Sequence, residues 1–206
     1  VHDLIKKYFT EHQRIIFNGN GYAPEWVEEA KRRGLPNLVS MVDAVDTLTT
    51  DKAVKLFEKF KIFTRAELES REEILYETYA KTLNIEALTM IHMASRQLLP
   101  VCVSYSRKLA DAVIAVTEAG ADASVQEELL NEVSRELKTA KLALEALKID
   151  EEKAGEIANA REKAFFYKDV IKEDMEALRA PIDRLEMLVE KDMWPMPTYA
   201  DLMFEV

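Results

Sequence analysis

The sequence has little glycine, little proline and one cysteine, and each shortage excludes a class of protein. Its 206 residues include 5 Gly and 6 Pro, well below the averages of about 7% and 5%. β-Sandwiches and α/β folds with phosphate-binding loops need more turns and glycine, so the composition predicts a large helical protein. Cys102 cannot form a disulfide within the chain and lies in an apolar run, residues 98–103. We therefore expect it in the core of a reduced, cytoplasmic protein.

Long apolar runs and clustered basic charge are also missing. The uncharged stretch 97–106 is much shorter than the roughly 20 residues that cross a bilayer, and no signal segment stands out. The chain has 28 basic and 38 acidic residues, a net charge of −10, which argues against nucleic acid or an anionic membrane as a partner. Hydrophobic residues make up 48% of the chain, which is enough for a core.

Short helical patterns fill the sequence as far as residue 62. They begin directly after Val1, so we expect the chain to be part of a longer protein. The expected helices cover residues 2–13, 24–33, 37–48 and 51–60, the last capped by Thr50. The strongest turn signal is the Asn-Gly-Asn-Gly run from Asn18 to Gly21. The basic run Lys31 to Arg33 is typical of a helix C-terminus, where it complements the helix dipole.

Three long helical patterns follow. Thr64 and Glu67 fit a capping box that begins a helix ending near Gly120, and Pro100 should kink this helix without ending it. Ser124 and Glu127 fit a second capping box, which begins the second long helix.

The second helix is expected to break at Ile149–Asp150. The third carries apolar residues seven apart from Ile157 to Leu185, with a kink at Pro181. Because short connections make neighbouring helices antiparallel, the sequence predicts an all-α fold built on an antiparallel, coiled-coil-like three-helix bundle.

The predicted organisation has three parts: a short-helix connector (1–62), the long-helix bundle (63–193) and a Pro-rich docking tail (194–206). Two prolines in the run Trp194 to Pro197 prevent the third helix from continuing. Thr198 and Asp201 can cap one last helical turn. The tail is too apolar to stay in water, so we expect it to dock on another surface.

No catalytic, cofactor-binding or metal-binding residue is predicted. His2, His12 and His92 lack the Glu-x-x-His and His-Glu-x-x-His spacings of metal sites, and His92 is expected to be partly buried and hydrogen-bonded. The Asn-Gly turn lacks the Lys-Ser/Thr of a phosphate-binding loop. An enzyme site assembled from scattered side chains, such as His92 and Tyr105, is the weakest of the alternatives.

Two stretches resemble a known family. Residues 14–22 (RIIFNGNGY), followed by 26–30 (WVEEA), are similar to the region just after the catalytic core in type III glutamine synthetases, and residues 194–206 (WPMPTYADLMFEV) resemble that family's C-terminus. Residues 57–70 and 85–90 also look similar. More faintly, residues 35–73 and the Pro-rich tail resemble the helical ending of type I enzymes. The long helices from about 85 to 191 would then be a type III elaboration.

The resemblance implies the C-terminal region of a glutamine synthetase, which uses ATP and Mg²⁺ or Mn²⁺ to join ammonia to glutamate in a cytoplasmic, ring-shaped homo-oligomer. The family's metal, ATP and glutamate ligands lie in the core upstream of the matching motifs, so no catalytic residue is carried over and the cofactors are expected in the parent enzyme. The local role implied is a structural or oligomerisation element that packs on the catalytic core and on neighbouring subunits and is inactive alone. The residues leave open an alternative, an independent helical adaptor or coiled-coil interaction module.

Overall fold

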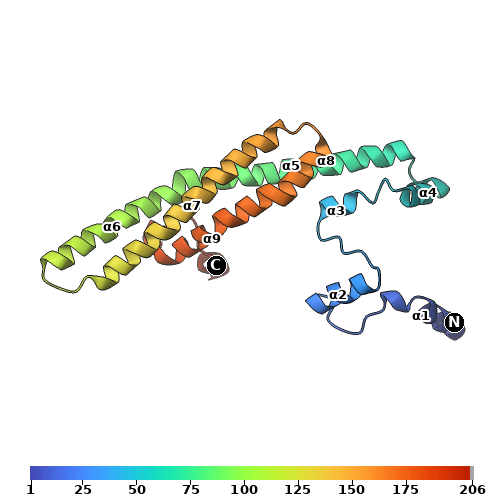
Figure 1. The fold of residues 1–206 in the computed structure, drawn as a ribbon, viewed down its shortest axis with the longest axis horizontal. Helices are drawn as coiled ribbons and strands as arrows, with labels where there is room; N and C mark the ends of the chain where they lie inside the picture. The colour runs from blue at the N-terminus through green and yellow to red at the C-terminus, as the bar shows by residue number, and fades with distance from the viewer. Residues whose placement is uncertain (205–206) are drawn as a thin grey trace.

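The computed structural model describes residues 1–204, which form helices and loops with no β-strand among them (Figure 1). The predicted all-α class with long helices is confirmed. The helices preceding the bundle are α1 (His2–Glu11), α2 (Pro24–Arg32), α3 (Met41–Val45) and α4 (Asp51–Lys59). The bundle contains α5 (Arg65–Met93), α6 (Leu99–Glu118), α7 (Ser124–Glu156), α8 (Ala160–Phe166) and α9 (Lys172–Leu188), and the tail ends in α10 (Tyr199–Phe204).

The first long segment of the bundle joins α5 to α6 without interruption. The capping box at its start is confirmed, because Thr64 Oγ1 accepts from the Glu67 N–H (3.4 Å) and the Glu67 carboxylate accepts from the Thr64 N–H (2.7 Å). Pro100 lacks the N–H that an α-helix requires at this position. The backbone widens to a π-helical turn over Ala94–Leu98, which ends two residues before the proline, and the helix then continues as predicted.

The second long segment, α7, differs from the prediction at both ends. The second capping box is wrong: Ala123 is the N-cap, and Asp122 Oδ1 accepts from the Ser124 N–H (3.0 Å) in its place. The break predicted at Ile149–Asp150 is also wrong. Both residues are helical, and Asp150 forms an ion pair with Lys153 one turn later (2.6 Å). The helix ends instead at residue 156, one residue after Gly155.

The third long segment runs through α8, a π-helical turn at Tyr167–Ile171 and α9. Asn159 caps its start by accepting from the Glu162 N–H (3.0 Å), so Ile157, predicted to belong to this helix, lies in the connection before it. α9 packs antiparallel to α7, which also packs on α6 (Figure 1). The core they share includes side chains with almost no exposed surface: Val133, Leu144, Leu147, Ile171, Leu178 and Leu185.

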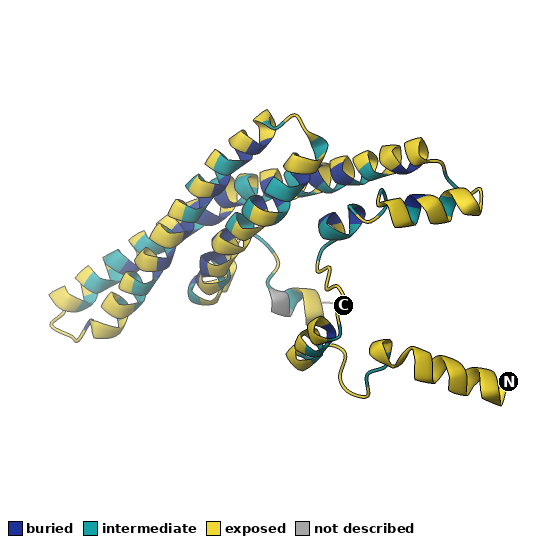
Figure 2. Ribbon diagram, turned by 45° about the vertical axis from the view of Figure 1, so that its right-hand side comes forward, coloured by how far each residue is buried: buried dark blue, intermediate teal, exposed yellow. Residues whose placement is uncertain are grey.

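α3 joins the preceding short helices to the bundle. It ends at Val45 and not near residue 48 as predicted, and the Thr47 hydroxyl donates to the Ala44 carbonyl (2.6 Å) where the helix stops. Val42 and Val45 are buried in a small cluster with Tyr76 and Ala164 of the bundle. α1, in contrast, has no buried residue, and it is coloured as exposed along its length in Figure 2. None of the helices in residues 1–204 is long and apolar enough to cross a membrane.

Candidate functional site

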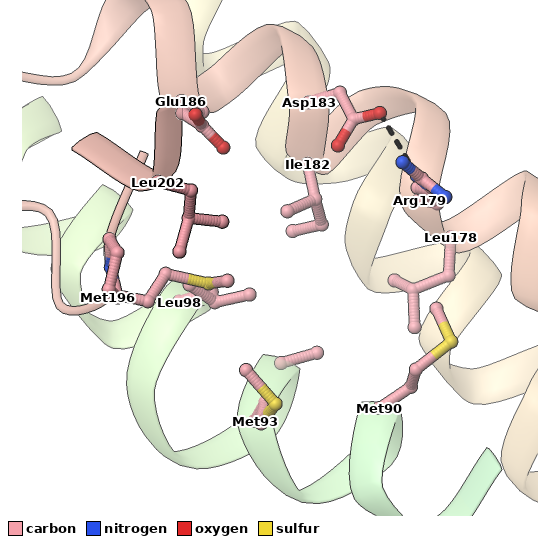
Figure 3. Close-up of a pocket in the computed structure, with 12 residues that line it drawn as sticks. Met90, Met93, Leu98, Leu178, Arg179, Ile182, Asp183, Glu186, Met196 and Leu202 are labelled. Carbon is pink, nitrogen blue, oxygen red and sulfur yellow. Dashed lines mark hydrogen bonds and ion pairs between the residues drawn. The ribbon is translucent and has the colours of Figure 1, made fainter. Parts of the chain in front are cut away.

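A pocket of about 280 Å³ lies between the bundle and the C-terminal tail (Figure 3). Its lining comes from α5 and the π turn after it, from α9 and from the tail: Met90, Met93, Ala94, Leu98, Leu178, Arg179, Ile182, Asp183, Glu186, Met196, Pro197 and Leu202. The size is near the lower limit of small-molecule pockets. Three methionines in the wall give it a flexible, polarizable surface that adapts to irregular apolar groups.

The polar groups of this pocket all come from one face of α9. Arg179 and Asp183 form an ion pair (3.3 Å), and Glu186 lies one turn beyond them along the rim (Figure 3). The rest of the wall is hydrocarbon and sulfur, with no nucleophile and no histidine. Such a pocket can hold an apolar group, but it lacks the acid–base pair or the nucleophile that catalysis requires.

The C-terminal tail forms one wall of the pocket. Trp194 is 7% exposed within the bundle core, and Met196 packs against that core. Thr198 and Asp201 form the predicted cap, in which the Thr198 N–H donates to Asp201 (2.9 Å) and the Asp201 N–H donates to Thr198 Oγ1 (3.2 Å). Beyond the cap, the apolar side chains are about three-quarters exposed: Leu202, Met203 and Phe204. Residues 205 and 206 of the predicted tail lie outside the described residues.

A second concentration of exposed apolar surface covers α1. Its apolar side chains follow the i, i+1, i+4, i+5 spacing that places them on one helix face, and each is more than half exposed: Leu4, Ile5, Tyr8 and Phe9. Four large apolar groups close together in water are unusual for a surface without a partner. This α1 face is therefore a candidate docking surface.

The turn after α1 is a small, self-contained motif. The Phe17 and Trp26 rings are in contact (4.5 Å between centroids), and the Arg33 guanidinium lies near both. Arg33 also donates to the Ile16 carbonyl (2.5 Å) and pairs with Glu29 (2.5 Å). The interpretation of the basic run as a charge complement of α2 is incomplete, because Arg33 also binds the carbonyl groups that end the preceding 3₁₀ turn.

A buried polar cluster links the three long segments of the bundle. The Asn84 amide donates to Glu151 Oε1 and to the Tyr167 hydroxyl (3.0 Å), and the Tyr167 hydroxyl donates to Glu151 Oε1 (3.1 Å). Glu151 is 8% exposed, and its Oε2 has no hydrogen-bond partner among the described residues. The sequence alone did not predict this cluster. Asn84 lies 67 positions from Glu151 and 83 positions from Tyr167, and no local motif connects residues that far apart.

Two carboxyl groups meet at the interface between α7 and α9. Burial, and then a hydrogen bond with Asp150, raise the pKa of the Asp174 carboxyl to about 6. Asp150 itself accepts from Lys153 Nζ (2.6 Å). Asp174 resembles the acids of enzyme sites only in its raised pKa, because it lies between packed helices and does not line the pocket described above.

The histidines and the cysteine do not form a reactive site. His92 is exposed and not partly buried as predicted, because it lies on the outer side of α5, and His2 and His12 are exposed as well. Cys102 is buried as predicted, and this burial raises the pKa of its thiol to about 11. Within the described part of the chain, no three His, Cys, Asp or Glu side chains gather where they could hold a metal ion.

Comparison with known proteins adds a family to this geometry. A family model for the glutamine synthetase C-terminal domain matches residues 1–117. Curated relatives extend the similarity over the rest of the chain. A glutamine synthetase of Butyrivibrio fibrisolvens is 34% identical over 208 aligned residues, which cover 100% of this chain and 30% of that protein.

Two other relatives give the same picture. A type-3 glutamine synthetase of Dictyostelium discoideum is 31% identical, and a glutamine synthetase of Bacteroides fragilis (strain YCH46) is 28% identical. Each alignment covers 98% of this chain and 28% of the relative. The chain thus spans less than a third of the length of the curated relatives it matches.

Proposed function

The chain belongs to the glutamine synthetase C-terminal domain family, and from this membership we propose that it is the C-terminal helical region of an enzyme that joins ammonia to glutamate with ATP. Its own task is structural. It packs on the catalytic part of the same polypeptide through the α1 face and shapes contacts between subunits of a homo-oligomer in the cytoplasm. ATP and Mg²⁺ or Mn²⁺ bind elsewhere in that enzyme.

The exposed α1 face is the observation that carries this proposal. α1 buries none of its residues, although Leu4, Ile5 and Phe9 are all apolar and more than half exposed. At about 25 cal/mol per Å² of apolar surface removed from water, covering such a face stabilises a contact substantially. A helix with an exposed apolar face of this kind typically packs against another part of a protein.

The chemistry of the described residues supports a role without catalysis. The apolar pocket beside the tail has no nucleophile, the one thiol is buried with a raised pKa, and the histidines are exposed and apart. Relatives that carry the enzyme name are more than three times longer than the part this chain matches. The reaction is therefore assigned to the whole enzyme and the scaffolding to this chain.

The proposal is tested in the complete polypeptide that the gene encodes. Leu4→Ser combined with Phe9→Ser should lower glutamine formation from glutamate, ammonia and ATP at least about tenfold, because the catalytic part loses its support. The matched control is Ile85→Ser with Leu88→Ser, two bundle residues of similar exposure (65% and 50%), which should keep the wild-type rate. Equal activity of both variants would overturn the proposal.

A second measurement separates the scaffold from a self-contained enzyme. Calorimetry of the 206-residue chain with ATP and Mg²⁺, and separately with glutamate, should show no binding at micromolar concentration. Micromolar binding of either compound would contradict the assignment of the substrate sites to the rest of the enzyme. A polypeptide that begins a few residues before Val1 and has no catalytic part would favour the helical adaptor.

A further inference from the structure

A second pocket, of about 320 Å³, lies between α5 and α8, beside the connection that joins α7 to α8. Its volume reaches the lower limit of small-molecule sites, which is about 300 Å³. The space is left open by four small residues in its wall: Ala80, Gly155, Ala158 and Ala160. Unlike the pocket beside the tail, this one is also lined by two lysines, a side-chain amide and a tyrosine hydroxyl, so it offers polar contacts from both helices.

The polar groups of this second pocket form two levels along the helices. α5 and α8 pack on each other and run in the same direction (Figure 1). Lys81 and Lys163 form the first level, and Asn84 and Tyr167 form the second. The second level comes three residues later on α5 and four residues later on the other helix. At about 1.5 Å of rise per residue, the two levels are therefore about 5 Å apart.

The second level can only accept further hydrogen bonds. The Asn84 amide donates to both Glu151 Oε1 and the Tyr167 hydroxyl, and the Tyr167 hydroxyl donates its proton to Glu151. Asn84 Oδ1 and one lone pair of the Tyr167 oxygen are left without a donor in the described part of the chain. The Glu151 carboxylate behind them is 8% exposed and forms no ion pair among residues 1–204. A cationic donor bound at this level would satisfy the acceptors and compensate the buried charge.

The first level has the opposite chemistry. Lys81 donates to Glu77 (2.6 Å), which leaves two of its three N–H groups for another acceptor. Lys163 is half-buried, and its ammonium group has no ion pair or hydrogen bond with any described residue. A carboxylate has two oxygens and can accept a charge-assisted hydrogen bond from each lysine. The first level therefore suits an anionic group.

We propose that this second pocket binds a small zwitterion, an amino acid whose carboxylate lies between Lys81 and Lys163 and whose ammonium group lies at Asn84 and Tyr167. A simple anion is disfavoured by the carboxylates of Glu77 and Glu151, and a simple cation by the two lysines. A π-helical turn begins at Tyr167, and such turns are frequent at functional sites. The separation of about 5 Å between the levels suits an amino acid with its two charges several bonds apart, such as 4-aminobutyrate.

Calorimetric titration of the 206-residue chain tests whether both ends of the zwitterion are recognised. 4-Aminobutyrate should bind at least about tenfold more tightly than butyrate, which lacks the ammonium group, and than butylamine, which lacks the carboxylate. Each of these compounds loses the contacts of one level. Binding of either compound as tight as that of 4-aminobutyrate would overturn the proposal, and so would the absence of 4-aminobutyrate binding at about 10 mM.

Substitutions locate the binding site. Lys163→Met removes the unpaired charge at similar side-chain length, and Ala158→Leu narrows the pocket at an exposed residue of its wall. Each should weaken the binding of 4-aminobutyrate at least about tenfold. The matched controls Lys138→Met and Ala121→Leu alter exposed residues that do not line this pocket, and they should leave binding unchanged. Equal effects of the pocket variants and their controls would contradict the proposed site.

A nuclear magnetic resonance measurement checks the second level directly. In the ¹⁵N-labelled chain, 4-aminobutyrate should shift the side-chain amide resonances of Asn84 and leave those of the exposed Asn131 on α7 in place. Shifts of both amides, or of neither, would overturn the proposal. The pocket does not include the α1 face, so the variant Leu4→Ser with Phe9→Ser should bind 4-aminobutyrate normally. Failure of this proposal is therefore distinct from failure of the proposed function.

Discussion

The long-helix bundle and α1 are built from similar amphipathic patterns, but they differ in what covers their apolar faces. In the bundle, apolar positions of one helix meet those of two others, and Leu144 and Leu147 are fully buried. In α1 the same kind of face is more than half exposed. Helical periodicity therefore predicts which residues share a helix face. It does not predict which other part of the protein covers that face.

The largest effect expected from this comparison comes from shortening one leucine in each region. Leu144→Ala should lower the free energy of unfolding of the 206-residue chain by about 3 kcal/mol, because it removes a fully buried side chain and leaves a cavity. Leu4→Ala, at a residue 54% exposed, should change it by less than about 0.5 kcal/mol. Urea unfolding measured by circular dichroism checks both values, and similar losses for the two variants would contradict the comparison.

The ion pair that joins the end of α3 to the bundle should make stability depend on pH. The Arg161 guanidinium, and to a smaller extent the Tyr76 hydroxyl, lower the pKa of the Asp46 carboxyl to about 2. Because this pKa is lower in the folded state, the stabilisation is present above about pH 4 and is lost as the pH falls towards 2. Asp46 is partly exposed, so we expect about 1 kcal/mol.

Asp46→Asn should remove this loss on acidification and lower the free energy of unfolding at pH 7 by about 1 kcal/mol, because the ion pair is then absent at every pH. Thermal unfolding of the wild type and the variant between pH 2 and pH 7 measures this change in acid dependence. An unchanged acid dependence in the variant would show that the ion pair does not fasten α3 to the bundle.

The bundle interior should show the opposite pH dependence. The pKa of Asp174 is raised to about 6, chiefly by burial, so the folded state binds this proton more strongly than the unfolded state. Stability should therefore rise as the pH falls from 7 through 6 towards 4. Asp174→Asn should remove this gain and raise stability at pH 8 by about 1 kcal/mol. Thermal unfolding between pH 4 and pH 8 would contradict the account if the variant kept the wild-type slope.

The smallest effect is expected in the turn after α1. A Cβ at Gly19 would lie 2.7 Å from the Phe17 ring, and that ring contacts Trp26 and lies near Arg33. Gly19→Ala should displace the ring and change the Trp26 fluorescence, measured in a Trp194→Phe background, without shifting the unfolding midpoint of the bundle. A spectrum identical to that of the parent would show that the motif is looser than described.

Sequence reasoning succeeded where the physical cause is local. The Thr64–Glu67 capping box and the Thr198–Asp201 cap each join residues three positions apart, and both are present. The prediction of a break at Ile149–Asp150 was wrong. The apolar pattern pauses there, but neither residue is a glycine or a proline that would end the helix. The capping box predicted at Ser124 was also wrong, because the Asp122 carboxylate accepts from the Ser124 N–H at the start of this helix.

The candidate sites were only partly predictable for a different reason. Which α1 residues share a face follows from their spacing, but their exposure depends on what the remaining helices cover. The Asn84, Glu151 and Tyr167 cluster and the pocket beside the tail bring together distant segments, and their formation depends on how three long helices align. Such alignments are properties of packing, and no short motif encodes them.

Hydrogen exchange of α1 tests the central claim most directly. In the 206-residue chain, the amides of residues 2–11 should exchange rapidly, because α1 buries no side chain and frays easily. In the complete polypeptide the same amides should be protected at least about a hundredfold more strongly, since the α1 face is then covered by the catalytic part. Equal, rapid exchange of these amides in both samples would contradict the account.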